Sequence, residues 1–248
     1  MDQVLLITGG GRGIGAATAL LAAKRGYAVA VNYASNSLAA DEVVRTIRAG
    51  GGSAMAVQAD VGDEAQVLAM FAKIDAKLGR LTALVNNAGV VNVRARVDEM
   101  SVARMERMFR VNVIGSFVCA REAVKRMSTK YGGAGGAIVN ISSGAARIGS
   151  PGQYVDYAAS KAAIDTLTIG LAKEVAMEGI RVNAVRPGLI DTEIHASGGI
   201  PDRVAELAPT VPMQRAGSPE EIAGAILWLL SPEASYTTMA LLDVTGGR

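Results

Sequence analysis

The chain has 248 residues, half of them hydrophobic, which is enough to bury the core of one large α/β domain. Its formal net charge of +2 excludes a strong electrostatic attraction to nucleic acid, and no apolar run reaches the about 18 residues that a membrane span needs. A single cysteine, Cys119, excludes an intrachain disulfide and a thiolate metal site, and it favours a reducing compartment, so we expect a cytoplasmic protein.

Apolar strand-like runs alternate with longer helical segments along the chain. Strands are predicted, in chain order, at 3–8, 27–33, 54–60, 81–89, 135–143, 180–188 and 240–244. Helices are predicted between them at 15–26, 37–49, about 63–78, 101–128 with a break near Gly115, 157–178 and 218–230. This repeated βαβ pattern predicts one Rossmann-like, doubly wound α/β domain over 1–248, with a mainly parallel seven-stranded sheet and helices on both faces. The irregular segment 191–216 is too long for an ordinary connection, so we expect a substrate lid at about 189–213.

A glycine-rich turn, "TGGGRGIG" at 8–15, joins the first predicted strand to the first helix. Such a turn lets the backbone approach a phosphate and aims free helix N–H groups at it. A phosphate loop of the ATP type needs Gly-Lys-Ser/Thr, whereas here Gly13 is followed by Ile14 and Gly15. The turn therefore favours a dinucleotide, although any tight strand-to-helix turn needs glycine for steric reasons.

The stretch "YVDYAASK" at 154–161 places Tyr157 four residues before Lys161. On a helix these positions share one face, so the two side chains can act together. A free phenol has a pKa of about 10, and a nearby ammonium is expected to lower it. Tyr157 can then give a proton to a carbonyl oxygen. The alternative is an ordinary helix with an exposed Tyr–Lys pair.

These motifs occur in the order typical of the short-chain dehydrogenase/reductase family, which the chain resembles over almost its whole length. The spacing Thr8-Gly9-x-x-x-Gly13-x-Gly15 is similar to that family's turn and differs from the ordinary G-x-G-x-x-G fingerprint. The other matches are Asp60, "NNAG" at 86–89, Asn112, Ser143 in "NISS", Tyr157-x-x-x-Lys161, and "RPG" at 186–188 with Thr192. Within that family, the chain resembles bacterial 3-oxoacyl-carrier-protein reductases and sugar dehydrogenases.

The resemblance implies four catalytic residues. Ser143 would hydrogen-bond the substrate oxygen, Tyr157 would carry the proton, and Lys161 would also bond the nicotinamide ribose. Asn112 would pin a helix break and hold a water that leads protons from Lys161 to solvent. The family's serine lies about thirteen residues before its tyrosine, whereas Ser143 and Ser142 lie fourteen and fifteen before Tyr157. We take Ser143 and infer an inserted residue near "SPGQY".

The resemblance also implies which residues line the pocket. The cofactor contacts would be Thr8, Gly9, Gly13, Ile14, Gly15, Asp60, Val61, Asn87, Ala88, Gly89, Tyr157, Lys161, Pro187, Gly188, Ile190 and Thr192. The substrate end would be lined by Ser143, Tyr154, Ile190, Ile194 and His195. His195 is the chain's one histidine; a general-base role for it is the alternative, and without a cysteine cluster we expect no metal site.

The end of the second strand indicates which nicotinamide cofactor is bound. Selection of NAD usually places an acid there to take both ribose hydroxyls. Here the strand ends "VNYASN", and no acid follows until Asp41. Asn32, Ser35 and Asn36 can instead donate to a 2′-phosphate, and Arg12 is placed to approach it, unless Arg12 points to solvent. We therefore predict NADP(H).

The predicted activity is reversible reduction of a ketone or aldehyde, a small-molecule carbonyl substrate, to an alcohol. One alternative is reduction of a 3-oxoacyl thioester carried by an acidic carrier protein. The carrier could bind to Lys173 and to the basic cluster Arg121, Lys125, Arg126 and Lys130, although ordinary surface charge explains these residues equally well. Another is a regulator that binds NADP without turnover, against which the intact set of Ser143, Tyr157 and Lys161 argues.

Family members usually form tetramers, so we predict a homotetramer that pairs helices 101–128 and 157–178, with the C-terminal strand at a second interface. Apolar residues beyond the need of one sheet face support this prediction: Met105, Met108, Phe109, Ile164, Leu167 and Leu171. The family usually has Thr-Gly where this chain has Thr238-Met239, which leaves the local geometry there open.

Overall fold

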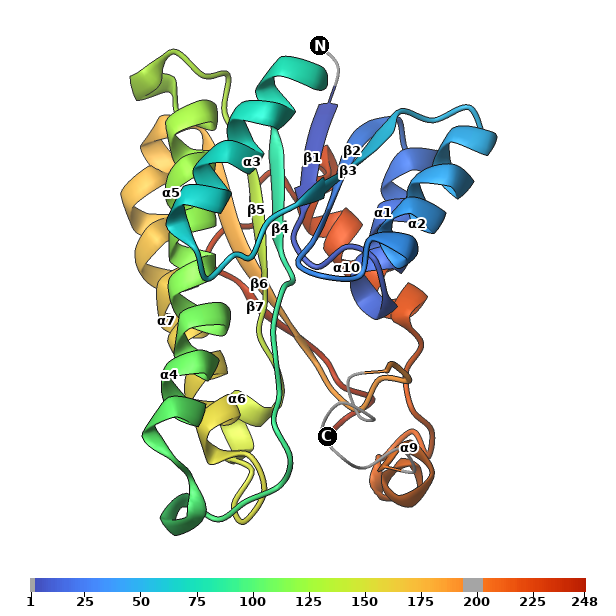
Figure 1. Ribbon diagram of the computed structural model, residues 1–248, viewed down its shortest axis with the longest axis vertical. Coiled ribbons are helices and arrows are strands. Elements are labelled where there is room, and N and C mark those ends of the chain that lie inside the picture. Colours follow the sequence, from blue (N-terminus) through green and yellow to red (C-terminus); the bar gives the residue numbers. More distant parts are fainter. Residues whose placement is uncertain (1–2, 194–202) are drawn as a thin grey trace.

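A seven-stranded sheet crosses the computed structural model, which describes residues 3–193 and 203–248 (Figure 1). The strands, in spatial order, are β3 (Ala54–Gln58), β2 (Tyr27–Tyr33), β1 (Gln3–Ile7), β4 (Ala83–Asn86), β5 (Gly136–Ile141), β6 (Ile180–Pro187) and β7 (Leu241–Val244). Every neighbouring pair is parallel. The predicted Rossmann-like α/β fold is confirmed, and the sheet is wholly rather than mainly parallel.

Two layers of helices cover the two faces of the sheet (Figure 1). One layer holds α1 (Gly13–Lys24), α2 (Ser37–Ala49) and α10 (Pro219–Leu230), and the other holds α3 (Glu64–Lys77), α4 (Val102–Phe109), α5 (Gly115–Met127) and α7 (Val155–Val175). Strand β1 shows why both layers form: Leu5 and Ile7 enter one apolar core, while Val4 and Leu6 enter the other. Side chains alternate along a strand, so a continuous apolar run needs cover on both faces.

The long helix predicted at 101–128 is interrupted by a π-helical turn, Arg110–Ile114, that joins α4 to α5. The predicted break near Gly115 therefore lies a few residues too late. Gly115 begins α5, and a Cβ there would lie 2.8 Å from both the Cγ2 and the carbonyl oxygen of Val61. Glycine is required at this position because the helix packs closely against Val61, and not because the helix ends there.

Two short helices were not predicted. Helix α6 (Ala145–Ile148) follows β5, and α9 (Arg203–Leu207) leads into a 3₁₀ turn at Ala208–Thr210 within the segment expected to be irregular. Neither is long enough to display the repeated apolar spacing from which a helix is recognised in sequence. By contrast, α10 begins as its sequence indicates, because Ser218 and Glu221 form a reciprocal capping box.

Burial and contacts describe the lone cysteine and the basic cluster. Cys119 is fully buried, and burial raises its pKa to about 12. The basic cluster does not form a freely solvated face, because Arg121, Lys125 and Arg126 all pair with the buried carboxylate of Glu122. Two of these arginines also reach the acids of α3.

The apolar residues expected at a subunit contact divide into two groups. Met108, Ile164 and Leu167 are buried within the chain itself, so the prediction that they are surplus to its core is wrong. Phe109 is exposed, together with Ile114 and Phe117 on the next two turns. The exposed apolar surface of α4 and α5 is therefore centred on these three side chains.

Candidate active site

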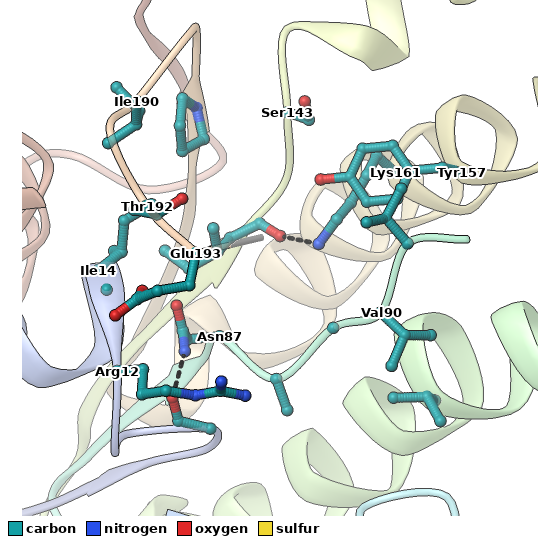
Figure 2. A pocket seen from close by; sticks show the side chains of 18 of the residues that line it. Arg12, Ile14, Asn87, Val90, Ser143, Tyr157, Lys161, Ile190, Thr192 and Glu193 are labelled. Carbon is teal, nitrogen blue, oxygen red and sulfur yellow. Dashed lines mark hydrogen bonds between the residues drawn. The ribbon is translucent and has the colours of Figure 1, made fainter. Parts of the chain in front are cut away.

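A cavity of about 710 Å³ opens at the carboxyl ends of the strands, where the order reverses between β1 and β4 (Figure 2). The segments after β1, β2, β3, β4, β5 and β6 all contribute to its wall. Parallel α/β sheets bind ligands in this crevice, because the loops on either side of the reversal run to opposite faces. Its volume lies within the usual range for small-molecule and cofactor sites.

The glycine-rich turn forms one end of the cavity. Gly9 and Gly13 have φ angles of 61° and 50°, which favour glycine. A Cβ on Gly15 would lie 2.5 Å from the carbonyl oxygen of Gly9, so this residue lets the turn close on itself. Gly9, Arg12, Gly13 and Ile14 line the cavity, whereas Gly15 does not.

Hydrogen bonds from the end of β4 hold this turn in place. The hydroxyl of Thr8 accepts from the backbone N–H groups of Asn87 and Ala88, both at 3.0 Å. The Asn87 side chain donates to the carbonyl oxygens of Thr8 and Gly9 at 2.8 and 3.0 Å. Thr8 therefore supports the turn from behind, and it does not line the cavity as a cofactor contact would.

Asn32, at the end of β2, makes contacts that the sequence did not predict. Its amide donates to the carbonyl oxygens of Val57 and Ala59, and its Oδ1 accepts from the Gly9 N–H. The buried side chain is thus engaged in holding the turn against β3, and Asn32 also lines the cavity. Its role as a phosphate donor stays a prediction. Ser35 and Asn36 remain exposed on the cavity wall, with the Asn36 Oδ1 capping α2.

Arg12 adds a cation to the glycine-rich turn. It precedes α1, is exposed, and lines the cavity beside the turn (Figure 2). In the part of the chain that the structure describes, it forms no ion pair. Asp60 and Val61, after β3, also line the cavity, and the Asp60 carboxylate accepts from the Gly62 N–H at 2.9 Å.

Tyr157 and Lys161 lie one turn apart on α7, and both side chains enter the cavity with Ser143 (Figure 2). Lys161 is only 4% exposed, and its Nζ donates to the Ile141 carbonyl oxygen at 2.7 Å. Its pKa falls to about 8, chiefly because burial disfavours the ammonium, while the charge of Asp165 opposes that fall.

The expectation that Lys161 lowers the pKa of Tyr157 is not met. Burial raises the pKa of Tyr157, and the opposing influence is a hydrogen bond with Ser143. The Lys161 Nζ lies 5.7 Å from the centroid of the tyrosine ring and is directed to the backbone of β5. Tyr157 therefore carries its proton at neutral pH, which is the form that can donate to a carbonyl oxygen.

The two adjacent serines have different surroundings. The Ser142 hydroxyl is buried and donates to the Lys161 carbonyl oxygen at 3.1 Å. Ser143 instead faces Tyr157, and its oxygen accepts from the Ala145 N–H at the start of α6. Between Ser143 and Tyr157 the chain turns through Ser150, whose φ of 47° is rare outside glycine, and this turn holds the segment that we interpreted as an insertion.

Asn112 lies behind the cavity wall, at the centre of the π-helical turn. Its Oδ1 accepts from the Val90 N–H at 2.8 Å, and its Nδ2 donates to the Val90 carbonyl oxygen and to Ser160. Gly89 lies between Asn112 and Lys161, since a Cβ there would be 3.5 Å from the Asn112 Oδ1 and 3.6 Å from the Lys161 Nζ. Asn112 thus ties the helix irregularity to the segment after β4.

Tyr154, Pro187, Gly188, Ile190 and Thr192 also line the cavity, as expected from the sequence. Thr192 lies against the glycine-rich turn, since a Cβ on Gly13 would be 3.1 Å from its Cγ2. The other two residues expected at the substrate end, Ile194 and His195, lie outside the described residues, as does most of the expected lid. Residues 203–213 are described, but none of them is among the lining residues.

Sequence reasoning missed several lining residues, of which Arg107, Glu193 and Arg248 are charged. The Glu193 carboxylate faces the glycine-rich turn, where an Oε2 atom lies 3.7 Å from the position of a Cβ on Gly13 (Figure 2). Arg107 lies four residues before Val111, which also lines the cavity, and residues at this helical spacing share one face.

These surroundings fit a dinucleotide. Bare glycine backbone with positive φ angles faces the cavity beside the first turn of α1, as a pyrophosphate requires. Over 3–193 and 203–248, no group of three or more potential ligand side chains is arranged to hold a metal ion. Within the same ranges, no helix combines the length and apolarity of a membrane span. Fold and site together define a Rossmann-like protein suited to a nicotinamide cofactor.

Comparison with known proteins places the chain in a family. The family model described as enoyl-(acyl carrier protein) reductase matches residues 9–248. The chain is 58% identical over 245 residues to the uncharacterized oxidoreductase YgfF of Escherichia coli (strain K12), covering 99% of each chain. It is 40% identical over 246 residues to a 3-oxoacyl-[acyl-carrier-protein] reductase of Synechocystis sp., covering 99% of this chain and 96% of that one.

A solved structure agrees with these sequence relatives. A short-chain type dehydrogenase/reductase from Mycobacterium marinum matches with a TM-score of 0.92 and 37% identity, over 99% of this chain and 94% of that one. The chain therefore belongs to the short-chain dehydrogenase/reductase family and is an oxidoreductase of that family.

Proposed function

We propose that the protein is an NADP(H)-dependent reductase that reversibly converts a ketone or aldehyde to an alcohol. The observation that carries this proposal is the convergence of Ser143, Tyr157 and Lys161 on one cavity that also contains the glycine-rich turn. When bound, the nicotinamide supplies or accepts the hydride. A binding protein without turnover has no need for a buried lysine beside a phenol, so that alternative is less well supported.

The chain's own residues handle the oxygen and the proton. Ser143 and Tyr157 donate hydrogen bonds to the carbonyl oxygen, which polarises the C=O bond and orients its carbon. As negative charge develops on that oxygen, the Tyr157 hydroxyl transfers its proton, and the product is an alcohol. Lys161 would bond the ribose of the cofactor, and its ammonium lies beside the Tyr157 ring, 5.7 Å from the centroid. Asn112 holds the π-helical turn beside the path by which the proton is replaced.

The preference for NADP(H) rests on charge at the end of β2. Of the described residues that line the cavity, only Asp60 and Glu193 are acids, and neither follows β2. Arg12, Ser35 and Asn36 can together donate to a 2′-phosphate, with Arg12 giving a charge-assisted bond. Gly9, Gly13 and Ile14 would hold the pyrophosphate, Asp60 and Val61 the adenine, and Pro187, Gly188, Ile190 and Thr192 the nicotinamide side.

A small carbonyl compound is the substrate class that we favour over a carrier-bound thioester. Tyr154, Ile148, Leu189 and Ile190 give the substrate end an apolar lining. The basic cluster that we considered for carrier docking is largely engaged in ion pairs with Glu122 and α3. The similarity to a carrier-protein reductase keeps the thioester as the alternative.

We further propose a cytoplasmic homotetramer built from single-domain chains. Phe109, Ile114 and Phe117 form an exposed apolar surface on α4 and α5, which favours burial against a second copy. The exposed Trp228 and Met239 lie on α10 and beside the edge strand β7, which suits a second contact. Light scattering tests this proposal, and a monomer at micromolar concentration would contradict it.

A turnover screen tests the activity directly. The intact protein is assayed with NADPH and with NADH against ketones, sugars in the oxidative direction, and 3-oxoacyl thioesters. We expect NADPH-dependent reduction of apolar ketones. Faster reduction of the thioesters would favour the alternative substrate, and NADPH binding without turnover on any compound would favour the regulator.

A further inference from the structure

Asp156, the residue before Tyr157, has a carboxylate whose two oxygens are both engaged. Its Oδ2 accepts from Arg104 Nε at 2.7 Å, and its Oδ1 accepts from Arg104 Nη2 at 3.3 Å. The same Oδ1 accepts from the backbone N–H of Tyr157 at 2.9 Å. The Asp156 side chain is 1% exposed and that of Arg104 is 12% exposed, so this ion pair is almost dry.

Arg104 also contacts the wall of the cavity. Its Nη1 donates to the carbonyl oxygen of Val93 at 2.7 Å. Val93 belongs to the segment after β4, in which the preceding residues 90–92 line the cavity. One guanidinium on α4 therefore joins the first turn of α7 to the segment that faces it. A second link, from the Ala95 N–H to the Gln153 carbonyl oxygen, runs parallel to the first.

Stability alone does not account for this arrangement. A buried ion pair loses solvation for both charges, and apolar residues of the same volume often stabilise a fold equally well. What a rigid, bidentate guanidinium adds is fixed geometry between the groups that it bonds. Here those groups carry Tyr157 on one side and a cavity wall on the other.

We propose that Arg104 and Asp156 are positioning residues for the reaction, which set Tyr157 at a fixed place relative to the wall formed by residues 90–93. This inference rests on the proposed function. Without the Arg104–Asp156 ion pair, the first turn of α7 and the facing wall shift relative to each other. The Tyr157 hydroxyl is then no longer positioned to hydrogen-bond the carbonyl oxygen of a bound substrate. The glycine-rich turn has its own hydrogen bonds to Asn87 and Asn32, so the cofactor end keeps its shape.

The test compares three variants with the wild type for kcat, ketone KM, NADPH Kd and thermal stability. Arg104→Lys keeps the positive charge but loses the two parallel hydrogen bonds that the guanidinium donates to Asp156. The double variant Arg104→Met with Asp156→Asn removes both charges together and keeps an acceptor for the Tyr157 N–H, so no charge is left buried alone. Arg126→Lys is the matched control, because Arg126 on α5 is also mostly buried, pairs with Asp75 and Glu122, and does not line the cavity.

Both site variants are expected to lower kcat on the order of tenfold and to raise the ketone KM, with the NADPH Kd unchanged. Arg126→Lys is expected to change thermal stability by a similar amount and leave kcat unchanged. A wild-type kcat in either folded site variant would overturn the positioning role, as would an equal loss in Arg126→Lys or a parallel loss of NADPH affinity. A wild type that reduces no carbonyl would instead overturn the proposed function.

Discussion

Helix α7 contributes the aspartates of two arginine–aspartate pairs, Asp156 just before Tyr157 and Asp165 one turn after Lys161. The two pairs use their carboxylate oxygens differently. In Arg104–Asp156 both carboxylate oxygens have partners. In Arg186–Asp165 both bonds go to Oδ2, at 3.1 and 2.8 Å, while the buried Oδ1 has no partner among the described residues. The first pair is saturated, and the second leaves part of its charge uncompensated in the interior.

This difference shows that two aspartates in similar ion pairs can have different roles. One whose two oxygens are both bonded fixes the position of its neighbours, and one with an unbonded oxygen acts mainly through its charge. Asp156 adjoins Tyr157 and fixes its backbone. Asp165 follows Lys161 by one helical turn, and its charge favours the ammonium form of a lysine whose pKa burial has lowered to about 8. The predictions below separate these roles from each other and from the proton transfer that both support.

The largest effect is expected from Tyr157→Phe, which removes the group that both ion pairs would serve. The ring remains, so NADPH still binds, but the transferable proton is lost. We expect kcat to fall at least about a hundredfold, the usual order for general acid–base catalysis. Tyr154→Phe is the matched control and should change kcat far less. Near-normal turnover by Tyr157→Phe would exclude the mechanism.

Asp165→Asn tests the second pair through pH. Loss of this charge lowers the pKa of Lys161 further, so the ammonium titrates away at lower pH than in the wild type. Because reduction needs charged Lys161, the alkaline decline of kcat/KM should move to lower pH, with a several-fold loss near pH 8 and little change at about pH 6.

Asp243→Asn is the control for that experiment. Asp243, on β7, has an Oδ1 atom 3.8 Å from the Arg186 Nη1, and its replacement leaves the contact between Asp165 and Arg186 in place. Its pH profile should match the wild type. An unshifted profile in a folded Asp165→Asn protein, shown by thermal denaturation, would mean that Asp165 does not govern the charge of Lys161.

Arg12 differs from Arg104 and Arg186, because it forms no ion pair within the described ranges and is available to a ligand. The wild type should prefer NADPH to NADH tenfold or more in kcat/KM, about 1.4 kcal/mol. Arg12→Ala should narrow this ratio mainly by weakening NADPH. Arg107→Ala, another exposed arginine on the cavity wall, is the control. A wild type with equal efficiency for both cofactors would show that the end of β2 does not select for phosphate.

The smallest effect is expected at Met239, where strain affects stability and not chemistry. Its φ of 65° is a left-handed conformation that costs a non-glycine residue energy, and its side chain is 42% exposed. Met239→Gly should raise the free energy of unfolding by about 0.5 kcal/mol, since relief of strain exceeds the entropy cost of glycine. Thermal denaturation should show a slightly higher midpoint with unchanged kcat. A lower midpoint would indicate that the methionine side chain stabilises the assembly.

Local patterns were sufficient to predict most of the fold. Alternating apolar runs and glycine-rich turns repeat with regular spacing, so strands such as 27–33 and helices such as 37–49 were predicted at the bounds the structure gives them. No local pattern shows the π-helical turn at Arg110–Ile114, because hydrogen bonds tie Asn112 to Val90, twenty-two positions earlier. Only the family resemblance implied a helix break at Asn112. Short elements such as α6 offer too few residues for a period to be visible.

The candidate site likewise contains features that follow from local sequence spacing and features that depend on contacts between distant residues. The four-residue spacing of Tyr157 and Lys161 is local, and it correctly placed both on one helix face. The Arg104–Asp156 pair spans fifty-two positions, and the contacts of Asn32 with Val57 and Ala59 depend on the pairing of β2 with β3. Contacts of this kind follow from tertiary packing, so a single sequence gives no direct sign of them. They explain why the support that Asn32 gives to the glycine-rich turn was not predicted.

The most direct test of the central claim follows the hydride itself. NADPH carrying deuterium at the transferable position of its nicotinamide is incubated with the intact protein and the best ketone from the screen, and the product is examined by mass spectrometry and NMR. The account predicts an alcohol with deuterium on the carbinol carbon, formed by the wild type and largely absent with Tyr157→Phe. An unlabelled alcohol, or label transfer that proceeds equally well without the Tyr157 hydroxyl, would contradict it.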